Sequence, residues 1–281
     1  MDLLVNGIRN LKLFDSTLFH LEDTNATYRE YIDKLLQLDP KKLKYFLLTL
    51  KNREIINNQE AELEESFLLE LFKLTQRKDS IDITMKHYED GNLDKVELKK
   101  IHRIVIKGSS DDISANYDYR KDNNKWVGYY GTNGVQRVDY LPPDYNEIDE
   151  LIGITLDYLN EPDSKDDYNA IFIKPLIVHA LIAYIQPFGN GNTRLARVIQ
   201  HGKICKMTNE TYNTEFLSPP MYLSKNYLLT RGEYRGFIKN LAVNQNDESW
   251  NKWFNYNLNM IDEQLYYLNT QITTYQKSKI F

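Results

Sequence analysis

One stretch of the chain joins a flexible turn to two closely spaced basic residues. It reads Gln186-Pro187-Phe188-Gly189-Asn190-Gly191-Asn192-Thr193-Arg194-Leu195-Ala196-Arg197. A glycine- and asparagine-rich turn that enters a helix leaves the first N–H groups of that helix at the positive end of its dipole, where a phosphate can bind. Arg194 and Arg197 share one helical face, so both can reach the same polyanion. The alternative is a loop followed by two arginines that extend into solvent.

Helices are expected on both sides of this turn. The segment from Pro175 to Ile185 is apolar almost all round, as in the middle of a helical bundle, and its proline suits the first helical position. Apolar residues at helical spacing predict the next helix from Arg194 to Cys205. Later helices are expected around Arg231 to Leu241 and Glu248 to Tyr267.

Apolar stripes at helical spacing also mark the first hundred residues. They run from Tyr28 to Leu36, Leu43 to Leu50, Leu63 to Leu71 and Val96 to Ile104, and a fifth runs from Ile148 to Leu159. Neither a repeat nor a linker separates them, so we expect these helices to pack onto the rest of the chain.

A change of pattern near residue 120 predicts a β-hairpin. Two β-rich runs, 125–130 and 135–140, are separated by Gly131-Thr132-Asn133-Gly134. A lone hairpin is marginally stable in water, so this one should lie against the helices with one edge exposed. That edge, within Trp126 to Tyr140, could bind an extended segment of a protein partner.

Composition narrows the function classes. The chain has 281 residues, 35 Lys and Arg against 40 Asp and Glu, and a net charge of −5, which disfavours nucleic-acid binding. The single cysteine, Cys205, fits a reducing compartment. The longest apolar stretch, Ile171 to Ile185, is interrupted and shorter than the ~20 residues that span a bilayer. We expect a cytoplasmic protein that binds no membrane.

The turn resembles the signature of the Fic (Fido) domain family, His-Pro-Phe-x-Asp/Glu-Gly-Asn-Gly-Arg-x-x-Arg. The matching residues are Pro187, Phe188, Gly191, Asn192, Arg194 and Arg197. The hairpin with the following Pro142-Pro143 is similar to the family's flap region, and Pro175 to Ile185 is similar to its core helix. The resemblance covers roughly residues 95 to 265. It implies a mainly α bundle whose relatives typically transfer AMP from ATP to protein hydroxyls.

Three departures from this signature change the expected chemistry. Gln186 stands at the position of the catalytic histidine, and a carboxamide cannot serve as a general base. Asn190 stands at the position of a metal-binding acid, so Mg²⁺ should be held weakly. Thr193 replaces a glycine, which is costly wherever the backbone needs a positive φ.

Two histidines and one glutamate are further candidates for catalytic or regulatory roles. His201 lies on the face of the two arginines but ~6 Å further along the helix, and His179 lies two turns before Gln186, so both are interpreted as structural. Family members are often restrained by a glutamate that pairs with the second motif arginine. Glu62 is the nearest match, against the alternative that it lies on a solvated helix face. No set of residues has convincing metal-ligand spacing.

These observations lead to one leading hypothesis and two alternatives. We expect a Fic-type helical bundle with a small β-hairpin flap, in which 1–94 is a helical extension, 95–268 the Fic-like domain and 269–281 a tail. The leading hypothesis is a degenerate, ATP- or ADP-binding regulatory module with weak or no AMP transfer. Phosphate would bind at Gly191, Asn192, Arg194 and Arg197. The alternatives are an active adenylyltransferase with a non-histidine base, and a helical protein-interaction module without nucleotide.

Overall fold

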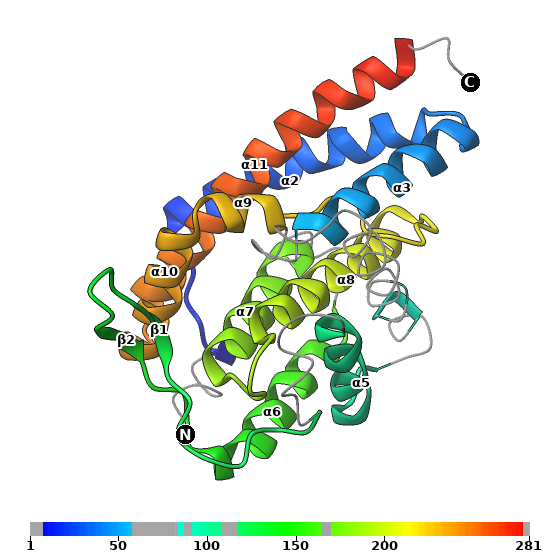
Figure 1. The fold of residues 1–281 in the computed structure, drawn as a ribbon. Coiled ribbons are helices and arrows are strands. Elements are labelled where there is room, and N and C mark those ends of the chain that lie inside the picture. Colours follow the sequence, from blue (N-terminus) through cyan, green and yellow to red (C-terminus); the bar gives the residue numbers. More distant parts are fainter. Residues whose placement is uncertain are drawn as a thin grey trace.

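The computed structural model describes residues 8–57, 82, 84–86, 92–107, 117–163 and 170–277. These residues form a helical bundle with one small antiparallel sheet, as predicted. Helices α7 (Ala170–Ile185) and α8 (Asn192–Tyr212) lie side by side at its centre (Figure 1). The turn singled out in the sequence connects them.

Helix α7 is buried because nearly every side chain along it is apolar. Ile171, Phe172 and Leu176 are fully enclosed in the core. The prediction that Pro175 occupies the first helical position is wrong, because α7 begins at Ala170 and the proline lies inside it. Proline removes only one backbone hydrogen bond, the one that its N–H would donate to residue 171. Burial of Ile171 and Phe172 favours the additional turn despite that loss.

The N-terminal helices pack against the C-terminal half of the chain. Helix α2 (Asp15–Leu36) lies along α11 (Asp247–Lys277), and α3 (Pro40–Asn57) contacts the short α9 (Ser224–Leu229) (Figure 1). Helix α11 continues from its predicted end at Tyr267 to Lys277. The predicted stripe from Leu63 to Leu71 lies outside the described residues.

The predicted hairpin is present. Strands β1 (Val127–Tyr130) and β2 (Gln136–Tyr140) pair antiparallel, with Tyr129 opposite Arg137. The Tyr140 hydroxyl donates a 2.7 Å hydrogen bond to the carbonyl of Ala183, which ties β2 to α7. On the other side, Arg235 of α10 (Arg231–Asn244) forms a 2.7 Å ion pair with Asp139.

Two further helices complete the lower part of the bundle in Figure 1. They are α5 (Lys95–Ile106) and α6 (Ile148–Asn160), the latter preceded by the 3-10 turn Tyr145–Glu147. Asp94 caps α5 by accepting a 2.8 Å hydrogen bond from the N–H of Glu97. Within the described part of the chain, no helix is both long and apolar enough to cross a membrane.

Candidate functional site

The turn between α7 and α8 is closed by one buried side chain. Asn192 accepts a 2.9 Å hydrogen bond from the N–H of Phe188 and returns one of 2.9 Å to the carbonyl of the same residue. Its amide also donates to Gln186 Oε1 at 3.0 Å. The hydrogen bonds of the Asn192 side chain therefore hold the loop in shape.

The side chain of Gln186, at the family's histidine position, links the end of α7 to Asn192. Its Nε2 donates to the carbonyl of Ala183 at 2.6 Å while its Oε1 accepts from Asn192. Its φ is +49°, a left-handed conformation that costs about 1 kcal/mol or more in a residue with a side chain. Both ends of the amide are thus committed to the protein, and neither has proton affinity near neutral pH.

Two residues far away in the sequence brace the turn from outside. Arg120 donates from its N–H to the carbonyl of Pro187 (2.9 Å) and from Nε to the carbonyl of Gln186 (3.0 Å). His102 of α5 stacks on Phe188 with ring centroids 3.7 Å apart and lies 2.8 Å from the carbonyl of Asn190. Burial lowers the pKa of His102 to about 4, so the neutral ring donates from Nε2.

Glycine is required at one position of the turn. Gly191 caps α8 with a φ of +76°, and a Cβ added there would lie 2.3 Å from Ile106 Cγ2. Thr193 lies inside α8 and is not among the described residues with positive φ. The predicted conformational cost of a threonine at this position, which depends on a positive φ, therefore does not arise.

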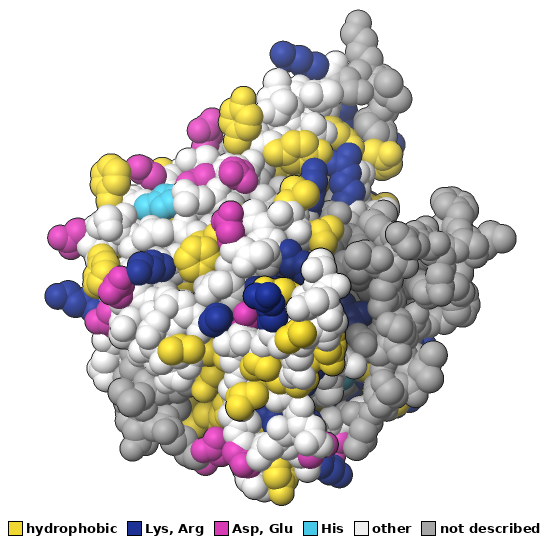
Figure 2. Space-filling model, turned by 60° about the vertical axis from the view of Figure 1, so that its left-hand side comes forward, with side chains coloured by type: hydrophobic (Ala, Val, Ile, Leu, Met, Phe, Trp, Pro, Cys, Tyr) yellow, Lys and Arg dark blue, Asp and Glu magenta, His cyan; other side chains and the backbone are white. Residues whose placement is uncertain are grey.

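A cavity of about 380 Å³ opens beside the turn, within the usual range of about 300–1,000 Å³ for ligand pockets. Five basic side chains and, among the described residues, no acidic one line it. The basic residues are Lys125, Arg194, Arg197, Arg231 and Arg235. Figure 2 shows the molecule from the hairpin side, with basic side chains near the middle of that face beside hydrophobic and acidic ones.

The two motif arginines both line this cavity. Arg194 is 7% and Arg197 1% exposed, and both line the cavity together with Gly191, Asn192 and Thr193. The first hydrogen bond of the α8 ladder runs from the N–H of Leu195 to the carbonyl of Gly191. The N–H groups of Asn192, Thr193 and Arg194 precede that ladder, at the positive end of the helix.

On the protein side of Arg197 lies an acid that the sequence patterns did not reveal. Glu54 of α3 is fully buried, accepts a hydrogen bond from Ser224 Oγ and lies 3.4 Å from His201 Nδ1. Burial raises the pKa of this carboxyl to about 8, against the charge of Arg197, which lowers it. Helix periodicity could not distinguish Glu54 from an exposed glutamate. Glu62, the residue proposed from the family pattern, lies outside the described residues.

The histidines considered as bases are structural. His179 donates from Nδ1 to Gln200 and accepts at Nε2 from the Tyr234 hydroxyl at 2.9 Å, and burial lowers its pKa to about 3. His201 Nε2 accepts from the N–H of Leu223 at 3.0 Å, and burial also lowers the pKa of this ring. Neither lines the cavity.

The donor set near Asn190 does not fit Mg²⁺. That ion prefers anionic oxygen ligands, whereas the side chain here is a neutral amide. The ammonium group of Lys125 donates to the carbonyl of Gly189 at 2.5 Å and lies 3.4 Å from Asn190 Oδ1. Among the described residues, no cluster of three or more His, Cys, Asp or Glu side chains could hold a metal ion.

Comparison with known proteins agrees with this architecture. The Fic/DOC family profile matches residues 92–201. A Fic domain containing signaling protein from Bacteroides thetaiotaomicron has a TM-score of 0.62 at 13% identity, covering 93% of this chain and 98% of its own. A Fic family protein from Desulfovibrio desulfuricans scores 0.58 at 17% identity, with 93% and 76% covered. Fic-1 from C. elegans scores 0.57 at 15% identity, with 90% and 73% covered. No curated protein sequence matches the chain.

Proposed function

Residues 92–201 belong to the Fic/DOC family, and we propose that the chain is a regulatory module of this family that binds a nucleoside di- or triphosphate. The phosphate chain would lie in the cavity beside the turn, between Arg194, Arg197 and the N–H groups that open α8. The observation that carries the proposal is the cavity itself, which five basic side chains line beside a helix N-terminus.

The described residues that line this cavity also support the proposal that AMP transfer is weak or absent, because none of them is a ready general base. Transfer to a hydroxyl needs a group that removes its proton, which contributes roughly 10²–10⁴ in rate. Gln186 has no such group, and its amide is committed to Ala183 and Asn192. Burial raises the pKa values of Tyr140 and Tyr227, which also line the cavity, so neither phenol is a ready base at neutral pH.

Calorimetric titration tests the binding proposal. ATP, ADP, AMP and inorganic tripolyphosphate should be titrated into the full chain, with and without Mg²⁺, at concentrations up to millimolar. We expect ATP and ADP to bind more tightly than AMP, because the longer phosphate chain reaches more of the basic side chains. Absence of heat for every ligand in both buffers would refute the proposal.

A transfer assay separates the regulatory module from an active enzyme. ATP labelled at the α- or γ-phosphate is incubated with the chain and candidate protein targets. We expect no labelled protein from the natural chain, and labelling from α-labelled ATP by the triple variant Gln186→His, Asn190→Asp, Thr193→Gly. Strong labelling by the natural chain that is lost in Arg197→Ala would favour the adenylyltransferase alternative.

A further inference from the structure

Lys125 is the residue of the cavity that departs most from what a nucleotide with a bound metal ion would need. It lies just before β1, and its ammonium group contacts Gly189 O at 2.5 Å and Asn190 Oδ1 at 3.4 Å. These oxygens belong to the part of the turn where the family pattern places a metal-binding acid. In this chain, the ammonium group of Lys125 contacts both of these oxygens.

The pair formed by Asn190 and Lys125 has the same net charge as a metal-binding acid with its metal ion. A carboxylate with a divalent cation has one net positive charge, and so has a carboxamide with an ammonium group. The cavity can therefore present the same net charge to a phosphate chain without any metal ion. A metal ion added beside Lys125 would meet a like charge at short range and, among the described lining residues, no carboxylate to offset it.

We propose that this cavity binds its polyphosphate as the metal-free anion, with Lys125 supplying the positive charge that a divalent cation would otherwise bring. The inference rests on the proposed function and refines it. Mg²⁺ in solution then acts as a competitor, because it binds the same phosphate oxygens that Lys125, Arg194 and Arg231 would contact. The ligand class is a di- or triphosphate chain, whether it carries a nucleoside or is inorganic.

The test compares titrations of ATP and of inorganic tripolyphosphate in EDTA and in excess Mg²⁺. For the natural chain we expect roughly tenfold tighter binding in EDTA, the effect of one charge-assisted contact. Lys125→Gln should lose about tenfold in EDTA. Lys121→Gln is the matched control, because this neighbouring lysine is exposed, lies 3.9 Å from Asp118 and does not line the cavity. It should bind like the natural chain.

A double variant tests the charge exchange in the opposite direction. Lys125→Gln with Asn190→Asp removes the ammonium group and restores an acid, so its binding should become tighter in Mg²⁺ than in EDTA. Tripolyphosphate binding as tight as ATP binding would identify the phosphate chain as the recognised part, whereas binding of ATP alone would add the nucleoside. Thermal unfolding of each variant confirms that it is folded.

The outcomes separate the two claims. Binding by the natural chain only in Mg²⁺ would overturn the metal-free inference and leave the proposed function standing. Lys125→Gln that binds as tightly as the natural chain in EDTA would also overturn the inference. No binding of any polyphosphate under either condition would overturn the proposed function.

Discussion

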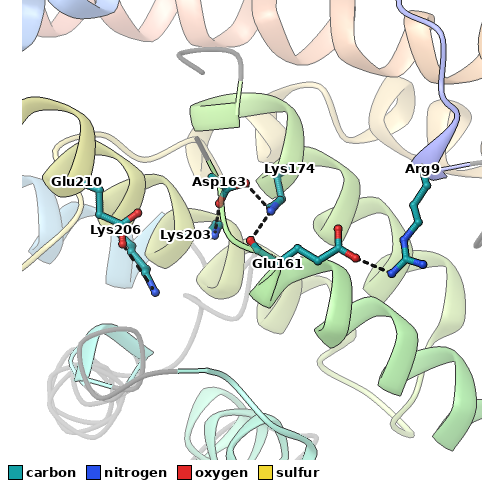
Figure 3. A network of polar contacts seen from close by, with 7 residues as sticks. All are labelled: Arg9, Glu161, Asp163, Lys174, Lys203, Lys206 and Glu210. Atoms are coloured by element: carbon teal, nitrogen blue, oxygen red, sulfur yellow. Dashed lines mark hydrogen bonds and ion pairs between the residues drawn. The ribbon is translucent and has the colours of Figure 1, made fainter. Parts of the chain in front are cut away.

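Two groups of basic residues lie along α7 and α8, and they meet different partners. In the first, Arg194 and Arg197 face a cavity that opens to solvent. In the second, Lys174 and Lys203 enclose the carboxylate of Asp163, which forms ion pairs with both ammonium groups (Figure 3). Lys203 lies 2.8 Å from Asp163 Oδ2, and Lys174 also donates to the carbonyl of Glu161 at 2.8 Å.

This difference separates basic residues that pair with a buried carboxylate from basic residues that line a cavity. Burial lowers the pKa of Lys203, and the ion pair with Asp163 opposes that shift, so this cluster is a closed structural unit that fixes the end of α6 to α7 and α8. No carboxylate is among the described lining residues of the cavity, although Asp139 pairs with the lining residue Arg235 at 2.7 Å from outside that lining. Basic side chains on the same helix thus have different surroundings, decided by which atoms face them.

The largest effect is expected from removing the shared carboxylate. Asp163→Asn leaves two buried ammonium groups with a neutral partner, so we expect a loss of about 3–5 kcal/mol in the free energy of unfolding. Urea denaturation measures it. Polyphosphate affinity of the folded fraction should stay unchanged, and a variant that loses affinity but keeps its stability would contradict the distinction between the two groups.

A smaller effect on binding, with little on stability, is expected at the cavity. Arg194→Gln removes one charged contact to phosphate, so the affinity for ATP should fall by about ten- to a hundredfold. Arg53→Gln is the control, because this exposed arginine contacts the Tyr267 hydroxyl and does not line the cavity. Unchanged affinity in Arg194→Gln, measured by calorimetry, would place Arg194 with the structural group.

The pH dependence of stability tests whether Arg197 belongs with the cavity group or pairs with the carboxyl group of Glu54. The pKa of Glu54 rises from 4.5 to about 8 on folding, so its contribution is complete below pH 4.5 and is lost as the pH rises to 8. Across that window the natural chain should lose more than ~1 kcal/mol of stability relative to Glu54→Gln. Urea denaturation at several pH values measures this. If the free energies of unfolding of the natural chain and of Glu54→Gln change in parallel with pH, Arg197 keeps the Glu54 carboxylate ionised and is internally paired.

The smallest effect is expected at the exposed rim of the second group. Lys206, which is half-buried, and Glu210, which is exposed, are 3.9 Å apart (Figure 3). Glu210→Gln should change the free energy of unfolding by less than ~0.5 kcal/mol. A loss comparable with that of Asp163→Asn would show that exposure does not distinguish the members of this network.

Periodicity predicted most of the bundle, and its errors occurred where burial outweighed local preference. The mainly α fold and the hairpin are confirmed, because apolar spacing and the Gly131–Gly134 turn are local signals. Local preference predicts a helix start at Pro175, but the helix begins at Ala170 because core burial extends it. The phosphate roles of Gly191, Asn192, Arg194 and Arg197 remain predictions.

The sequence by itself determined the turn, the glycine at its helix cap and the shared face of the two arginines, because neighbours along the chain specify these features. Tertiary structure decided what surrounds them. His102, Arg120 and Lys125 reach the turn from at least 64 positions away, and Glu54, on another helix, interacts electrostatically with Arg197. Their side chains meet only after the helices pack, and no local spacing encodes which charges then share a cavity.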